Sequence, residues 1–92
     1  MSSDNAIHGH VQGRVQGVGF RYFAKTRALE LSLRGWVKNS PDGSVEILAK
    51  GDPKGLERFM HYLRIGPHGS KVEKADFYAF HEPKEFEHFE IR

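Results

Sequence analysis

Polar and apolar residues alternate along the first part of the chain. The even positions from residue 8 to 14 are polar, and the odd positions are small or apolar: Ile7, Gly9, Val11, Gly13 and Val15. A period of two is typical of a strand with one buried face, so we expect a strand over residues 7–15. Apolar residues then recur with the helical period, at Phe20, Phe23, Ala24, Ala28 and Leu31. This second pattern predicts a helix that begins near Phe20.

The middle of the chain has the pattern of a β-hairpin. Residues 33–39 and 44–50 are strand-like and flank the turn sequence Ser-Pro-Asp-Gly. Pro41 suits the second position of a type I turn, and Gly43 suits the left-handed position after it. We therefore expect two antiparallel strands joined at this turn.

A second helix and two short strands complete the pattern. Asp52 and Pro53 mark a helix start, and Gly66 followed by Pro67 marks its end. The apolar stripe between them consists of Leu56, Phe59, Met60 and Leu63. Residues 75–80 and 88–91 are strand-like. The order β-α-β-β-α-β with one extra strand predicts an α+β fold, a ferredoxin-like α/β sandwich whose antiparallel sheet carries both helices on one face.

Length and composition narrow the class of protein. A chain of 92 residues suits one domain over residues 1–92, and we expect residues 1–5 to form a frayed tail. The chain has no cysteine, which excludes disulfides and thiolate metal sites. The 14 basic and 12 acidic residues are interspersed, so the charge gives weak support for a nucleic-acid partner. No signal peptide or membrane span is recognisable, so we expect a cytoplasmic protein.

Glycines gather where the first strand ends and the helix begins, in the stretch GRVQGVGFR over residues 13–21. Gly17 and Gly19 could let consecutive backbone N–H groups point inward, where the helix dipole also favours an anion. Arg21 could add a bidentate, permanently charged contact to a phosphate. The alternative is a tight turn whose glycines only provide positive φ, beside a surface arginine. The spacing alone leaves both interpretations open.

Two further sets of polar residues are candidates for chemistry. Asn39 lies on the inward side of its strand, where its amide could hold a water molecule or, alternatively, bond its own turn. His8 and His10 share one strand face, but no cysteine or carboxylate near them in the sequence completes a metal-ligand set. We expect these and the other histidines to be solvated surface residues, and we expect no metal site.

Two motifs carry a family resemblance. GRVQGVGFR followed by GWVKNSPDGSVE (residues 35–46) resembles the acylphosphatase family, and the likeness extends over about residues 6–92. The resemblance implies a ferredoxin-like fold and hydrolysis of acyl phosphates to a carboxylate and inorganic phosphate, with no metal or cofactor. It further implies that Arg21 binds the phosphate and that Asn39 positions the attacking water. The phosphate cradle that it implies consists of Val15, Gln16, Gly17, Val18, Gly19 and Phe20.

Gly9 takes an inward strand position where relatives usually carry a larger apolar residue, so we expect weaker packing there. The tripeptide VQG occurs twice, and only the second copy continues into the motif.

Two other functions fit the predicted order of elements. One is an RNA-binding module, which is disfavoured because the aromatic-glycine stretch lies at a strand-to-helix turn. The other is an acylphosphatase-like domain of a carbamoyl-transfer or hydrogenase-maturation protein. We expect instead a free-standing, monomeric enzyme that acts on a small molecule, with no nucleic acid or membrane partner.

Overall fold

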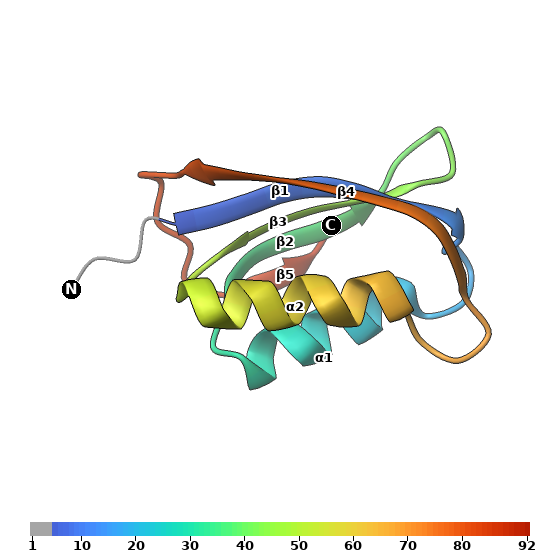
Figure 1. The fold of residues 1–92 in the computed structure, drawn as a ribbon, viewed down its shortest axis with the longest axis horizontal. Coiled ribbons are helices and arrows are strands. Elements are labelled where there is room, and N and C mark those ends of the chain that lie inside the picture. The colour runs from blue at the N-terminus through green and yellow to red at the C-terminus, as the bar shows by residue number, and fades with distance from the viewer. Residues whose placement is uncertain (1–4) are drawn as a thin grey trace.

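The computed structural model describes residues 5–92, and these form a five-stranded sheet with both helices packed on one face (Figure 1). The elements in chain order are β1 (Asn5–Arg14), α1 (Phe20–Glu30), β2 (Arg34–Asn39), β3 (Val45–Lys50), α2 (Pro53–Ile65), β4 (Lys71–His81) and β5 (Phe89–Ile91). The ferredoxin-like α+β sandwich predicted from the sequence is confirmed. Part of the expected tail, residues 1–4, lies outside the described residues, whereas Asn5 belongs to β1 and pairs with His81.

The sheet has the strand order β4-β1-β3-β2-β5 and is mixed rather than purely antiparallel. Strand β1 pairs antiparallel with β3 and β4, and β2 pairs antiparallel with β3. The added strand β5 pairs parallel with β2, with Gly35 opposite Phe89 and Val37 opposite Ile91. This parallel pairing follows from the path of the segment between β4 and β5. The chain leaves β4 at one edge of the sheet and enters β5 at the other edge from the same end (Figure 1).

A buried lysine binds the segment between β4 and β5, residues 82–88, to the sheet. Lys50, at the end of β3, is only 1% exposed. Its Nζ donates to the carbonyl oxygen of Lys84 at 2.9 Å and lies 3.3 Å from Oε2 of Glu85. A buried ammonium needs such partners, because burying an unpaired charge is costly. Residues 84 and 85 are thereby held at the end of β3, which helps to set the position of β5.

The core lies between the sheet and the helices. Its buried side chains are Ile7, Val11, Val15, Phe20, Ala24, Ala28, Leu33, Val37, Val45, Ile47, Ala49, Leu56, Phe59, Leu63 and Phe89. Each large member stabilises the fold by roughly 1.5–3 kcal/mol through burial. The rings of Phe59 and Phe89 pack edge to face at 5.8 Å, which ties β5 to α2. Leu33 and Val37 have the same strand parity as Asn39, so this core agrees with the inward side predicted for that strand.

The hairpin turn has the predicted geometry. The N–H of Gly43 donates to the carbonyl oxygen of Ser40 at 3.1 Å, and Gly43 has φ +95°. Asp42 fastens the same turn, because its Oδ1 accepts from the N–H of Ser44 at 2.9 Å and from its hydroxyl at 2.6 Å. These bonds lower the pKa of Asp42 below its ordinary 3.8.

The expectation of weak packing at Gly9 is wrong. A Cβ at this position would lie 2.1 Å from the carbonyl oxygen of Asp76 and 2.6 Å from Cδ1 of Phe77, both on the neighbouring strand β4. Phe77 is paired with Gly9 in the sheet and packs against the core. The ring of Phe77 therefore fills the space that a larger residue at position 9 would take.

Candidate active site

The connection between β1 and α1 is an open loop of bare backbone. Gly17 and Gly19 have φ +76° and +78°, in the left-handed region where a glycine is favoured. A Cβ built on either glycine meets no heavy atom within 4 Å. These glycines are therefore required for the path of the backbone and not for close packing, and one side of the loop stays open.

The start of α1 keeps its backbone donors available. Gly19 occupies the N-cap position, has no side chain with which to cap the helix, and is followed by no acidic residue in the first turn. The first intrahelical bond runs from the N–H of Phe23 to the carbonyl oxygen of Gly19 at 3.0 Å. The N–H groups before Phe23 lack an intrahelical acceptor, as at any helix start, and together with the helix dipole they favour an anion.

The loop and the end of β2 enclose a cavity of about 180 Å³. Its lining residues are Val15, Gly17, Gly19, Phe20, Arg21, Tyr22, Asn39 and Ile91. Six of them belong to the set expected from the sequence, and Tyr22 and Ile91 do not. The cavity is smaller than the roughly 300–1,000 Å³ of sites for larger ligands, so it suits a small group.

Two residues of the expected cradle have side chains outside the cavity. Val18 packs against the hydrophobic core. Gln16 turns its amide to the hairpin, where Nε2 donates to the carbonyl oxygens of Ser40 and Ser44 at 2.9 Å each. The Ser44 carbonyl also accepts from the N–H of Ser40 at 2.8 Å. Gln16 thus ties the loop to the residue that follows Asn39.

Asn39 presents an unusual polar atom. Its Oδ1 is buried and has no hydrogen-bond partner among the described residues, a condition that it shares with Nε of Arg27. An Asx contact would require this oxygen to accept from the turn, and Asp42 makes that contact instead. A buried acceptor without a partner costs about 1–3 kcal/mol and requires an explanation. Because Asn39 also lines the cavity, a ligand or water there is the simplest one.

Arg21 completes the polar part of the cavity. Its Nη1 donates to the carbonyl oxygen of Arg92 at 3.5 Å, which is long for a hydrogen bond. This contact uses one of the five N–H donors of a guanidinium. The cavity thus combines a positive side chain, a helix start and an unpartnered amide oxygen.

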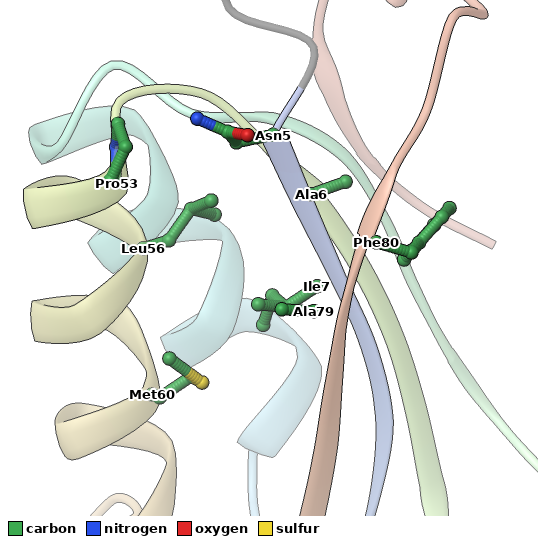
Figure 2. A pocket seen from close by; sticks show the side chains of 8 residues that line it. All are labelled: Asn5, Ala6, Ile7, Pro53, Leu56, Met60, Ala79 and Phe80. Atoms are coloured by element: carbon green, nitrogen blue, oxygen red, sulfur yellow. The ribbon is translucent and has the colours of Figure 1, made fainter.

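A larger cavity of about 450 Å³ lies between α2 and the strands β1 and β4 (Figure 2). Figure 2 shows Leu56 and Met60 extending from α2 toward Ile7 and Ala79. Asn5, Ala6, Pro53 and Phe80 complete its lining, which contains no ionisable side chain. This cavity therefore has no charge with which to bind an anion.

The histidines form no metal centre in the part of the chain that the structure describes. Nε2 of His8 lies 2.7 Å from Oε2 of Glu46 on the open face of the sheet. Within residues 5–92, no group of three or more His, Cys, Asp or Glu side chains is placed to hold a metal ion. In the same residues, no helix is long and apolar enough to cross a membrane.

The fold and the cavity define an α/β sandwich with a small cavity at the start of its first helix. The family model Acylphosphatase matches residues 7–91. The chain belongs to the acylphosphatase family, so the resemblance seen in the two motifs is confirmed.

Individual relatives agree with this assignment. A curated acylphosphatase of Thermus thermophilus is 52% identical over 66 residues, covering 72% of this chain and 75% of the relative. The crystal structure of acylphosphatase from Bacillus subtilis superposes with a TM-score of 0.93 at 40% identity, covering 96% of this chain and 98% of that one. Full-length HypF in the phosphate- and nucleotide-bound form matches at 28% identity and a TM-score of 0.86, and the likeness covers 12% of that chain.

Proposed function

We propose that the chain hydrolyses acyl phosphates in this cavity, with the loop backbone and Arg21 binding the phosphoryl group and Asn39 positioning the attacking water. As a member of the acylphosphatase family, the chain is a hydrolase acting on acid anhydrides, and its substrate is an acyl phosphate. The observation that most directly supports the residue roles is the buried, unpartnered Oδ1 of Asn39 in the same cavity as Arg21.

The phosphoryl group is bound by backbone and side chain together. The N–H groups of the cradle (Val15, Gln16, Gly17, Val18, Gly19 and Phe20) surround its oxygens, and the guanidinium of Arg21 contacts two of them. These donors are fixed before the substrate arrives, so they stabilise the charge of the transition state without reorganisation. The open side of the loop at Gly17 and Gly19 supports this arrangement.

The amide of Asn39 acts on the water. Its Oδ1 accepts a hydrogen bond from the water, and its NH2 group donates to a phosphoryl oxygen. The water oxygen forms a bond to phosphorus as the bond from phosphorus to the acyl oxygen breaks. The electron pair of that bond leaves with the carboxylate, and the proton of the water passes to the phosphate or to solvent.

The reaction needs little further assistance, because a carboxylate is a good leaving group. We therefore propose that turnover requires no metal or cofactor, and that the protein acts as a monomer in the cytoplasm. Sedimentation equilibrium and cell fractionation test the last two points directly.

The first experiment follows hydrolysis of benzoyl phosphate with EDTA present. We expect turnover by the wild-type protein and a loss on the order of 10³-fold in Arg21→Ala. Arg58→Ala is the matched control, because Arg58 is exposed on α2 and lines a different cavity. Turnover that vanishes with EDTA, or an Arg21→Ala variant as active as Arg58→Ala, would contradict the proposal.

Titration with inorganic phosphate separates the two roles. We expect Arg21→Ala to lose both phosphate binding and turnover. Asn39→Ala keeps phosphate binding and loses about 10²–10³-fold in kcat, the usual effect of removing one preorganised group. If Asn39→Ala loses binding in proportion to turnover, the amide anchors the ligand and does not position water.

A further inference from the structure

The cavity mouth carries two exposed apolar side chains that phosphate binding does not require. Tyr22 is 72% exposed and Ile91 is 39% exposed, and both line the cavity together with Arg21 and Asn39. The other large apolar residues of the lining, Val15 and Phe20, are only 1% exposed. Among the apolar lining residues that the structure describes, Tyr22 and Ile91 are therefore the two in a position to contact the part of a substrate that extends out of the cavity.

The two side chains come from different layers of the molecule. Tyr22 belongs to the first turn of α1, directly after Arg21. Ile91 belongs to β5, where it pairs with Val37 of β2, the strand that ends at Asn39. Strands β2 and β5 lie in the sheet and α1 lies in the helix layer (Figure 1). Ile91 thus shares the sheet layer with Asn39, whereas Tyr22 belongs to the helix layer.

The geometry of phosphoryl transfer distinguishes between them. The attacking water and the leaving oxygen lie roughly in line on opposite sides of the phosphorus. If Asn39 holds the water from the sheet layer, the acyl group leaves toward the helix layer. An aromatic ring exposed on that side offers an apolar surface to an acyl group and loses little conformational entropy on binding.

We infer that Tyr22 is a specificity-determining residue, whose ring contacts the acyl group and favours aromatic or bulky apolar acyl phosphates over acetyl phosphate. This inference rests on the proposed function, because it presupposes the phosphoryl group in the loop and the water at Asn39. It concerns the acyl half of the substrate, which the two sequence motifs leave open.

The experiment compares kcat/KM for benzoyl phosphate with kcat/KM for acetyl phosphate. We expect Tyr22→Ala to lower the benzoyl-to-acetyl ratio by about 3- to 10-fold, the range of one aromatic contact, with the inhibition constant of inorganic phosphate unchanged. Tyr22→Phe keeps the ratio, because the ring remains. Ile91→Ala also keeps the ratio, because Ile91 lies on the side of the water.

Tyr78→Ala is the matched control. Tyr78 is 68% exposed on β4, the opposite edge of the sheet from β5, and its loss leaves both substrates unaffected. An unchanged ratio in an active Tyr22→Ala protein, or a ratio that falls only in Ile91→Ala, overturns the inference alone. A wild-type protein that hydrolyses neither substrate overturns the proposed function, and this inference with it.

Discussion

Helices α1 and α2 lie on the same face of the sheet, yet their first turns are built differently (Figure 1). Helix α2 satisfies its own donors: Oδ2 of Asp52 accepts from the N–H of Lys54 at 3.0 Å and of Gly55 at 3.3 Å, and Pro53 begins the helix. Helix α1 has a left-handed glycine at its N-cap and no capping side chain.

The starts of the two helices also differ in the charge of their side chains. Asp52 places a carboxylate at the positive end of the dipole of α2, which is favourable. Arg21 places a cation at the same end of α1, which is unfavourable until an anion arrives. The start of α2 therefore contributes to stability alone, whereas the start of α1 gives up stability that, in the proposed function, a bound phosphate restores. Phosphate should accordingly raise the Tm of the protein, since it binds the folded state.

The largest effect is expected when the start of α1 receives a carboxylate of its own. We expect Gly19→Asp to lower kcat/KM by about 10³-fold and to abolish the rise of Tm with phosphate. A unit charge about 4 Å from the ligand costs about 4 kcal/mol at an effective dielectric constant near 20. Enzyme assays with benzoyl phosphate and thermal melts with and without phosphate provide the measurement.

Gly19→Asn is the control for shape. Asn and Asp both tolerate the left-handed conformation that Gly19 adopts at φ +78°. The Asn variant should lose far less activity, because it adds the same bulk without the charge. Equal losses in the two variants would show that geometry and not charge limits the site.

The next largest effect is expected at Gln16, which ties the loop before α1 to the hairpin that follows Asn39. We expect Gln16→Leu to lower kcat on the order of 10-fold while phosphate still binds, because small misplacements of a positioning group reduce turnover strongly. The variant removes both hydrogen bonds from Nε2 to the carbonyl oxygens of Ser40 and Ser44. Steady-state kinetics and phosphate inhibition measure the two quantities separately.

Gln12→Leu is the matched control, because Gln12 occupies the same place in the first VQG and is exposed on β1. It should leave kcat unchanged. A Gln16→Leu protein with unchanged kcat, or one in which kcat and phosphate affinity fall together, would exclude a positioning role for the amide.

The same residues show which features of the fold and site could be predicted from the sequence. The period of two in β1, the helical stripes and the Asp52-Pro53 start are local patterns, so they could be predicted. The two site motifs are also local, and family resemblance supplied their proposed roles. By contrast, the bonds of Gln16 join residues 24 and 28 positions apart, and the parallel pairing of β5 depends on how the chain passes from one edge of the sheet to the other.

The exposure of a side chain and the close approach of two strands could not be predicted from the sequence either. Gly9 looked like a packing defect because the ring of Phe77, which fills that space, comes from β4. Sequence reasoning assigned no role to Tyr22, and its place at the cavity mouth follows from the way α1 meets β2 and β5. Such features depend on which distant segments meet, and this is decided by the whole fold.

A smaller effect is expected at the start of α2. Asp52→Ala should lower the free energy of unfolding by about 1 kcal/mol, the usual contribution of an N-cap, and lower Tm by about 4–8 °C. The kcat for benzoyl phosphate should stay unchanged, because Asp52 caps α2 only. Thermal melts and assays on the same preparation check both. Asp52→Asn, which can still cap, should restore most of the loss. A fall in kcat with little loss of stability would erase the contrast between the helices.

The smallest effect is expected at Glu46, which lies on the open face of the sheet, away from both helix starts. Burial raises the pKa of Glu46, but the hydrogen bond with His8 and the charge of Lys38 together lower it below its ordinary 4.5. A lowered pKa favours the charged form in the folded state. The resulting stability is present above pH 4.5 and is lost as the pH falls through that value toward the lower pKa of the folded protein.

Urea unfolding at pH 7 and at pH 3 measures this contribution. We expect Glu46→Gln to reduce the acid-induced loss of stability by less than about 1 kcal/mol, because the pair is partly exposed to solvent. The kcat at pH 7 should stay at the wild-type value, since Glu46 lies on the face that the helices leave open. If Glu46→Gln instead changes the phosphate-induced rise of Tm, the anion site extends through the sheet, and the start of α1 cannot be treated separately from it.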